Sequence, residues 1–141
     1  MFNGPQLRPM TESDLPAARE LWAASEGVEL AEGDSLEELS RYLRRNPGTS
    51  HVAQTGESLC GAVLAGHDGR RGFIYHLAVA LDQQRTGVGR QLIDRSLAAL
   101  KAEGVVRVLI LVARENERGQ RFWSKHGWEP LGSALPMGLD L

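Results

Sequence analysis

The chain has 141 residues, of which 42% are hydrophobic and 24% charged, a composition typical of one globular domain and unlike a disordered tail or a coiled coil. Its 16 Lys and Arg against 18 Asp and Glu give a net charge of −2, which argues against a nucleic-acid partner. The single cysteine, Cys60, cannot form an internal disulfide and indicates a reducing compartment. No apolar run approaches the roughly 20 residues that cross a bilayer, and residues 1–10 do not resemble a signal peptide. We therefore expect a cytoplasmic single domain, 1–141, with no membrane partner.

The first third of the chain predicts a short strand followed by two helices. Residues 6–8 read as extended, and Ser13 is the expected N-cap of a helix that runs to residue 24, because Pro16 then falls in the first turn. Ser35 is the expected N-cap of a second helix over 36–44, which Asn46-Pro47-Gly48 ends.

The middle of the chain changes to the spacing of strands. Three apolar-rich stretches at 51–54, 59–65 and 72–80 are separated by short polar turns, which is the pattern of an antiparallel meander. A helix over 87–103 and an almost wholly apolar stretch at 105–112 follow. The latter is expected of a strand covered on both faces.

The end of the chain predicts one more helix, over 118–126, and two extended pieces at 128–131 and 136–141. The whole order is βααβββαβαββ. It predicts an α/β fold, a mixed sheet of about six to seven strands flanked by about four helices.

The most informative stretch is 77–90, where a strand enters a glycine-bearing turn that opens a long helix. Gly87 and Gly89 let a ligand approach the backbone, and the first N–H groups of the helix favour an anion. Arg85 and Arg90 add positive charge there. The pattern therefore predicts a cradle for phosphate or diphosphate.

Two common phosphate-binding motifs do not match this stretch. A Walker A loop needs Gly-Lys-Ser/Thr, but Arg90 follows Gly89. A dinucleotide fingerprint needs a small residue at the position of Leu92, and an acid about 20 residues further on, where 106–112 has none.

Residues Gln84-Arg85-Thr86-Gly87-Val88-Gly89 resemble the (Gln/Arg)-x-x-Gly-x-Gly/Ala signature of the GNAT superfamily of N-acetyltransferases. Residues 75–79 resemble the strand that precedes this signature, and Asn116 with 121–128 resembles a later helix of the family. Asp14-Leu15-Pro16 is also typical, so the resemblance covers nearly the whole chain. It implies a splayed GNAT-like sheet that holds acetyl-CoA as co-substrate.

The resemblance also implies which residues hold that cofactor. The main chain of the strand would contact the pantetheine arm and the acetyl carbonyl, an added-strand mode of binding, and the amides of the glycine turn would hold the diphosphate. Asn116 would reach the pantetheine, with a simple helix N-cap as its alternative role. The cofactor-binding residues expected in this way are Leu77, Ala78, Val79, Gln84, Arg85, Thr86, Gly87, Val88, Gly89, Arg90, Asn116 and Trp123.

The usual acid and base of the family are missing. Tyr75 and Leu111 stand where many members carry a glutamate, and Trp123 stands in place of the tyrosine that protonates the thiolate. Tyr75 and His76 are the remaining catalytic candidates. Only one of them is expected to face the cleft, because adjacent side chains of a strand alternate. For both, packing in the core is the competing interpretation, and transfer by positioning alone also stays open.

Six acids and no Lys or Arg lie between Glu26 and Ser40. Because the family's acceptor site is walled by this part of the chain, we hypothesise a cationic acceptor. A solvated helix face is the alternative. The four histidines show no metal-ligand spacing, so no metal is expected. The apolar residues 136–141 suggest pairing in a homodimer.

The resemblance thus implies an acyl-CoA-dependent N-acyltransferase that transfers acetyl from acetyl-CoA to a primary amine, of a small molecule or a peptide, by direct attack in a ternary complex. Two alternatives stay open at this point. One is a CoA-binding module without catalysis, and the other is a transferase of a larger acyl group.

Overall fold

The computed structural model describes residues 4–141, which fall into two compact units. The first ends at Leu111 and contains the sheet and three helices, and the second runs from Val112 to Leu141 and contains one helix. Residues 1–3 of the expected domain lie outside the described residues, and the single-domain interpretation stays a prediction. Among the described residues, none of the helices has the length and apolar character to cross a membrane.

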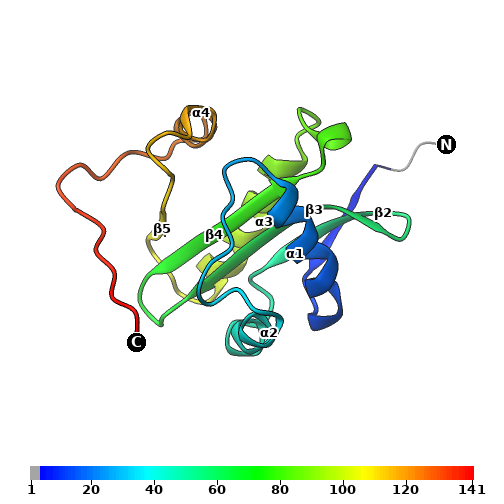
Figure 1. Cartoon of the computed structure of the whole chain (residues 1–141), viewed down its shortest axis with the longest axis horizontal. Helices are drawn as coiled ribbons and strands as arrows, with labels where there is room; N and C mark the ends of the chain where they lie inside the picture. Colours follow the sequence, from blue (N-terminus) through cyan, green and yellow to red (C-terminus); the bar gives the residue numbers. More distant parts are fainter. Residues whose placement is uncertain (1–3) are drawn as a thin grey trace. The chain divides into compact units, whose positions relative to one another are not determined.

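The first unit is built on a five-stranded mixed sheet in the order β1-β2-β3-β4-β5 (Figure 1). Neighbouring strands from β1 to β4 pair antiparallel, and β4 pairs parallel with β5. The expected meander is therefore confirmed. The strands are β1 Gln6–Pro9, β2 His51–Thr55, β3 Ser58–His67, β4 Gly72–Val79 and β5 Val108–Ile110.

The predicted helices are present with ends shifted by one or two residues. They are α1 Leu15–Ala24, α2 Leu36–Arg45, α3 Val88–Ala102 and α4 Glu117–Lys125, with short 3-10 turns η1 Glu12–Asp14 and η2 Leu81–Gln83. Ser35 caps α2 as expected, since its side chain accepts from the Glu38 N–H. The expected cap at Ser13 is wrong. Thr11 instead caps η1, and Asp14 precedes α1.

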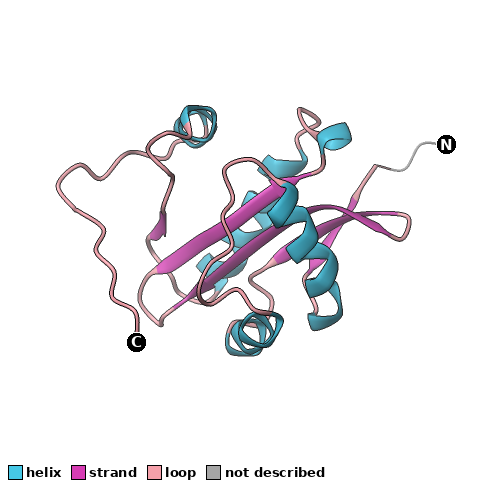
Figure 2. Cartoon of the chain, viewed as in Figure 1, coloured by secondary structure: helices cyan, strands magenta, loops and turns pink. Residues whose placement is uncertain are grey.

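The C-terminal part departs from the prediction. Residues 128–131 and 136–141 form no strand in the described chain, so five strands replace the expected six to seven (Figure 2). A strand needs a partner for its backbone groups, and Gly132, Pro136 and Gly138 interrupt this stretch. The homodimer expected through it stays a prediction.

The strand predicted at 105–112 shortens to β5 and is half-buried rather than covered on both faces. Val105 is buried but Val106 is 90% exposed. An apolar run cannot by itself say how many of its residues find a neighbouring strand.

One face of the sheet is covered by α1 and α2. Trp22 of α1 is fully buried, and its indole Nε1–H donates to the Ala62 carbonyl at 3.2 Å. The shared core contains Leu15, Ala18 and Trp22 of α1, Leu39 and Leu43 of α2, and Val52, Ala62, Leu64 and Ala78 of the sheet.

The other face carries α3. Its buried side chains include Leu92, Ile93 and Leu100. Gly61 of β3 allows this close packing, because a Cβ there would lie 2.8 Å from Leu92 Cδ1. The two helical layers therefore fix the position of β4 between them.

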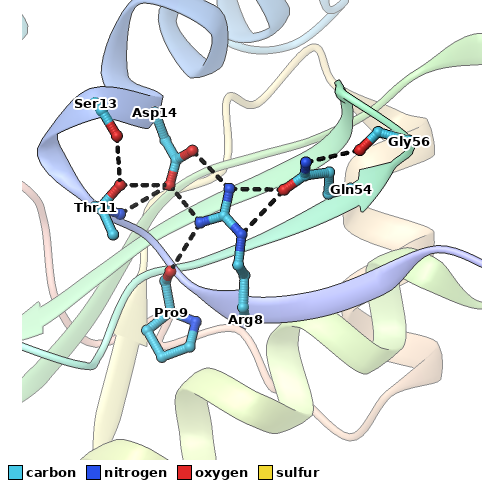
Figure 3. A network of polar contacts seen from close by, with 7 residues as sticks. All are labelled: Arg8, Pro9, Thr11, Ser13, Asp14, Gln54 and Gly56. Carbon is cyan, nitrogen blue, oxygen red and sulfur yellow. Dashed lines mark hydrogen bonds and ion pairs between the residues drawn. The ribbon is translucent and has the colours of Figure 1, made fainter.

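A polar network, defined by Arg8, Thr11, Asp14 and Gln54, joins β1, η1 and β2 (Figure 3). The Arg8 guanidinium donates to both Asp14 oxygens, at 2.7 and 2.8 Å, and to Gln54 Oε1 at 2.8 Å. Burial alone would raise the pKa of Asp14, but hydrogen bonds from Arg8 and Thr11 outweigh it and hold that pKa below its usual value. We call this set the N-terminal network.

Candidate functional site

The edge of β4 is open over its second half. β4 pairs with β5 at Gly72, Phe73 and Ile74 only, whereas on its other side it pairs with β3 as far as Val79. Within the first unit no strand flanks residues 75–79 on the β5 side. The pairing of these two parallel strands thus stops after three residues, as the expected splay requires, and the splay itself stays a prediction.

The backbone of this open half points outward at two residues. The Ala80 N–H donates to the Cys60 carbonyl, which places Ala80 and Ala78 at hydrogen-bonded positions with β3 by the alternation of antiparallel pairs. Leu77 and Val79 lie between them, so their N–H and C=O groups point away from β3. The main-chain groups of Ala78 are directed to β3 instead.

A bulge in β4 lies at Tyr75 and His76. Val63 pairs with Leu77 and Ala65 pairs with Ile74. The register therefore advances by two residues along β3 and by three along β4. The extra residue breaks the alternation of the strand. As a result both side chains lie on the face covered by α1 and α2, so the strand alternation assumed for these two residues does not hold. Which of them faces the cleft stays a prediction.

The ring contacts confirm this placement. His76 lies 5.2 Å from Trp22 of α1, centroid to centroid, and Tyr75 lies 6.1 Å from Tyr42 of α2. Tyr75 also stacks on Phe73 at 5.7 Å. The bulge therefore presents two candidate catalytic groups side by side.

His76 is held by a buried carboxylate. Its Nε2 lies 3.0 Å from Asp34 Oδ2, and the two side chains are only 13% and 11% exposed. Asp34 belongs to the loop that joins α1 to α2, which passes across β4 in Figure 1. The sequence interpretation counted Asp34 only as one of six acids. Its position next to the Ser35 cap did not mark it as a partner of His76.

Tyr75 is 46% exposed. Burial of its remaining surface, together with the Asp68 carboxylate, raises the pKa of Tyr75 above its usual value. The hydroxyl therefore keeps its proton at neutral pH and is a hydrogen-bond donor rather than a base.

The glycine turn leads directly from β4 into α3. Gly87 is the N-cap residue of α3, has φ of 90°, and provides no side-chain cap, so the first N–H groups of the helix point into the turn. Arg85 also has a positive φ, of 66°. Such left-handed residues before a helix turn successive N–H groups toward one side, as in anion-binding nests.

The side chains of the turn mainly stabilise it. Gln84 Nε2 donates to the Val79 carbonyl at 3.0 Å, and the Thr86 hydroxyl donates to the Gln83 carbonyl. Val88 is buried at the start of α3. Arg90 forms an exposed ion pair with Asp94 at 3.3 Å. Gly89 lies within the first turn of α3.

The two predicted residues of the second unit are placed within that unit alone. Asn116 Oδ1 accepts from the Gly119 N–H at 2.9 Å and caps α4, so the capping role is confirmed. A Cβ at Gly119 would lie 2.4 Å from Asn116 Nδ2. Trp123 packs edge-on against Trp128 with centroids 5.1 Å apart. The CoA contacts that the resemblance gives both residues stay predictions.

Other reactive groups do not form a second site. Cys60 is a buried thiol on β3, and Leu111, exposed after β5, carries no acid or base. Among residues 4–141 no group of three or more His, Cys, Asp or Glu is placed to hold a metal ion.

Comparison with known proteins identifies the family. The model of the acetyltransferase (GNAT) family matches residues 15–128. An acetyltransferase of Sodalis glossinidius is 29% identical over 104 residues, which cover 74% of this chain and 73% of that protein. The chain therefore belongs to the GNAT acetyltransferase family. It is an N-acetyltransferase, and acetyl-CoA is its co-substrate.

Solved structures agree on the fold. Ard1 from Thermoplasma volcanium superposes with a TM-score of 0.77 at 21% identity, over 89% of this chain and 82% of that one. AAC(6')-Iy, solved with a bisubstrate analogue, CoA-S-monomethyl-acetylneamine, gives a TM-score of 0.75 at 16% identity, over 99% and 100% of the two chains.

Proposed function

We propose that this protein transfers an acetyl group from acetyl-CoA to a primary amine by direct attack within a ternary complex. The observation that carries the proposal is the continuity of the open β4 edge with the uncapped start of α3. An extended thiol-bearing arm fits an unpaired strand edge. A diphosphate fits a helix N-terminus.

The pantetheine arm would lie along the open half of β4. The outward N–H and C=O groups of Leu77 and the outward N–H of Val79 supply the main-chain contacts, while the Val79 carbonyl is shared with Gln84. The diphosphate would then reach the N–H groups from Arg85 to Arg90. This arrangement brings the thioester to the bulge, beside Tyr75 and His76.

The acceptor would enter from the side of the α1–α2 loop. Glu26, Glu29, Glu32 and Glu37 are exposed there, and their charge favours a cationic amine. AAC(6')-Iy, which shares the fold, has been solved with an acetylated aminoglycoside fragment joined to CoA. We therefore propose a small-molecule amine with more than one positive charge, and amines of peptides are the competing class.

The chemistry requires loss of a proton from the acceptor. An alkyl ammonium has a pKa of about 10.4, so it is mostly protonated at neutral pH. Once neutral, its nitrogen attacks the thioester carbonyl, the C–N bond forms, the C–S bond breaks, and the CoA thiolate leaves with the second proton that the nitrogen gives up. His76 is the proposed acceptor of the first proton, and the Tyr75 hydroxyl would donate a hydrogen bond to the thiolate or to an intervening water.

Thiol release from acetyl-CoA across a panel of polyamines, aminoglycosides and peptides tests this function. We expect release with at least one cationic small molecule, and an acceptor KM that rises with salt. Calorimetry with CoA alone separates the alternatives. Binding without release across the whole panel indicates a CoA-binding module, and faster release from longer acyl-CoA donors indicates a larger acyl group. Absence of CoA binding refutes the proposal.

A further inference from the structure

The buried pair of Asp34 and His76 has the geometry of a carboxylate that orients a base. Asp34 is 8% exposed, and its Oδ2 contacts His76 Nε2 at 3.0 Å. The same oxygen accepts the Ala31 N–H at 3.0 Å, and the Asp34 carbonyl accepts from Arg19 Nε at 2.7 Å. Three contacts therefore fix this part of the loop, and one of them joins it to the imidazole of His76.

The pairing determines which ring nitrogen carries the proton. An ionised carboxylate only accepts hydrogen bonds, so the neutral imidazole must present Nε2–H to Asp34. The lone pair then resides on Nδ1. Among the described residues Nδ1 has no hydrogen-bond partner, and no buried side-chain nitrogen or oxygen lacks one. Nδ1 therefore reaches solvent.

The surroundings of His76 hold the ring in this orientation. Trp22, an uncharged residue of α1, packs against it with centroids 5.2 Å apart. Asp34 of the loop contacts the ring directly, Arg19 lies one step away through the Asp34 carbonyl, and Tyr75 precedes His76 on β4. The carboxylate also stabilises the imidazolium that would form after proton uptake.

We propose that Asp34 is a positioning residue for acetyl transfer, holding His76 as the Nε2–H tautomer so that Nδ1 takes the proton of the acceptor amine. The inference rests on the proposed function and gives Asp34 a role that the proposed function does not include. In the step, Nδ1 accepts one proton from the ammonium, directly or through one water. The neutral amine then attacks, the C–N bond forms and the C–S bond breaks. The second proton lost by the former ammonium nitrogen passes to the departing thiolate, and the imidazolium later releases its own proton to solvent.

Kinetics of Asp34→Asn test the role in catalysis. Asparagine keeps the size of the side chain but removes its charge. We expect kcat to fall about 10- to 100-fold, within the contribution of a general base, while the KM for acetyl-CoA stays unchanged. The exposed Glu20→Gln on α1 is the matched control and should leave the rate unchanged.

Ring-nitrogen NMR of the ligand-free protein tests the tautomer without any need for activity. We expect His76 to show a protonated Nε2 in the wild type and a mixture of tautomers in Asp34→Asn. An Nδ1–H tautomer in the wild type, or an unchanged kcat in Asp34→Asn, overturns the inference. If the tautomer is as expected but no amine is acetylated, the proposed function fails and the orienting contact stands. If Asp34→Asn does not fold, the wild-type spectrum still decides.

Discussion

Two buried aspartates of the first unit, Asp14 and Asp34, have side-chain partners of different chemical kinds. In the N-terminal network, Asp14 receives two hydrogen bonds from Arg8 and one from the Thr11 N–H. Beside the bulge, Asp34 Oδ2 accepts one hydrogen bond from the Ala31 N–H of its own loop and forms one with His76 Nε2. The first carboxylate is matched by a guanidinium, which only donates, and the second by an imidazole, whose two nitrogens can each donate or accept. The comparison teaches that the partner, more than the burial, distinguishes a carboxylate that stabilises the fold from one proposed to position a base.

The largest effect is expected at the partner of Asp34. His76→Gln removes the proposed proton acceptor but keeps a polar side chain of similar size. We expect kcat to fall about 100-fold or more, in the range of general base catalysis, with little change in the melting temperature. Steady-state thiol release and thermal unfolding measure the two. His67→Gln is the control, because His67 lies at the other end of the meander beside Glu103. Equal losses in both variants would contradict the assignment.

Disruption of the N-terminal network should lower the stability of the protein but not its activity. Arg8→Met leaves Asp14 buried without its cation and should lower the free energy of unfolding by about 2 kcal/mol, below the value for fully buried pairs because Arg8 is partly exposed. The kcat per folded molecule should stay unchanged. Urea unfolding with activity measured in parallel tests this, and a large loss of kcat would break the comparison.

The same variant has a pH signature. The pKa of Asp14 is lowered in the folded state, so its contribution to stability is present above the unfolded value of about 3.9 and is lost as pH falls through the folded value. The difference in unfolding free energy between wild type and Arg8→Met should therefore shrink in acid. Unfolding curves at pH 7 and near pH 3 measure it, and a difference that grows in acid would refute the assignment.

A smaller effect is expected at the glycine turn, where a matched pair exists. Gly87 and Gly69 have φ values of 90° and 95°, and an added Cβ would meet nothing within 4 Å at either. Alanine at each should therefore cost about 1 kcal/mol of backbone strain. Gly87→Ala should weaken CoA binding about fivefold, whereas Gly69→Ala in the β3–β4 turn should lower stability only. Calorimetry with CoA distinguishes them, and equal CoA affinities would count against the cradle.

The smallest effect is expected at Tyr75. Tyr75→Phe keeps the ring contacts with Phe73 and Tyr42 and removes only a hydroxyl that bears its proton at neutral pH. We expect kcat to fall about threefold, the value of one modest hydrogen bond, with no change in the pH–rate profile below pH 10. A shifted basic limb would show that Tyr75 titrates in catalysis.

The sequence predicted the elements that local patterns determine. The strand-turn-helix of residues 77–90 and the cap at Ser35 depend on glycines, caps and short-range spacing, and the structure places them as expected. The bulge at Tyr75 and His76 was not predictable, because it arises from the register of β4 against β3 rather than from the residues of β4. The contact between Asp34 and His76 joins residues 42 positions apart, and nothing local marks it. The two strands predicted at 128–131 and 136–141 do not form, because apolar residues alone do not supply a partner strand.

The extra residue of β4 makes this part of the chain sensitive to length. Between Ile74 and Leu77, β4 contains two residues where the paired part of β3 contains one. Only this extra residue lets two consecutive side chains face α1 and α2. Removing one residue would restore regular pleating and leave space for a single side chain. Acetyltransferases that share this arrangement should therefore tolerate exchanges of residue type at these positions far better than a single-residue deletion.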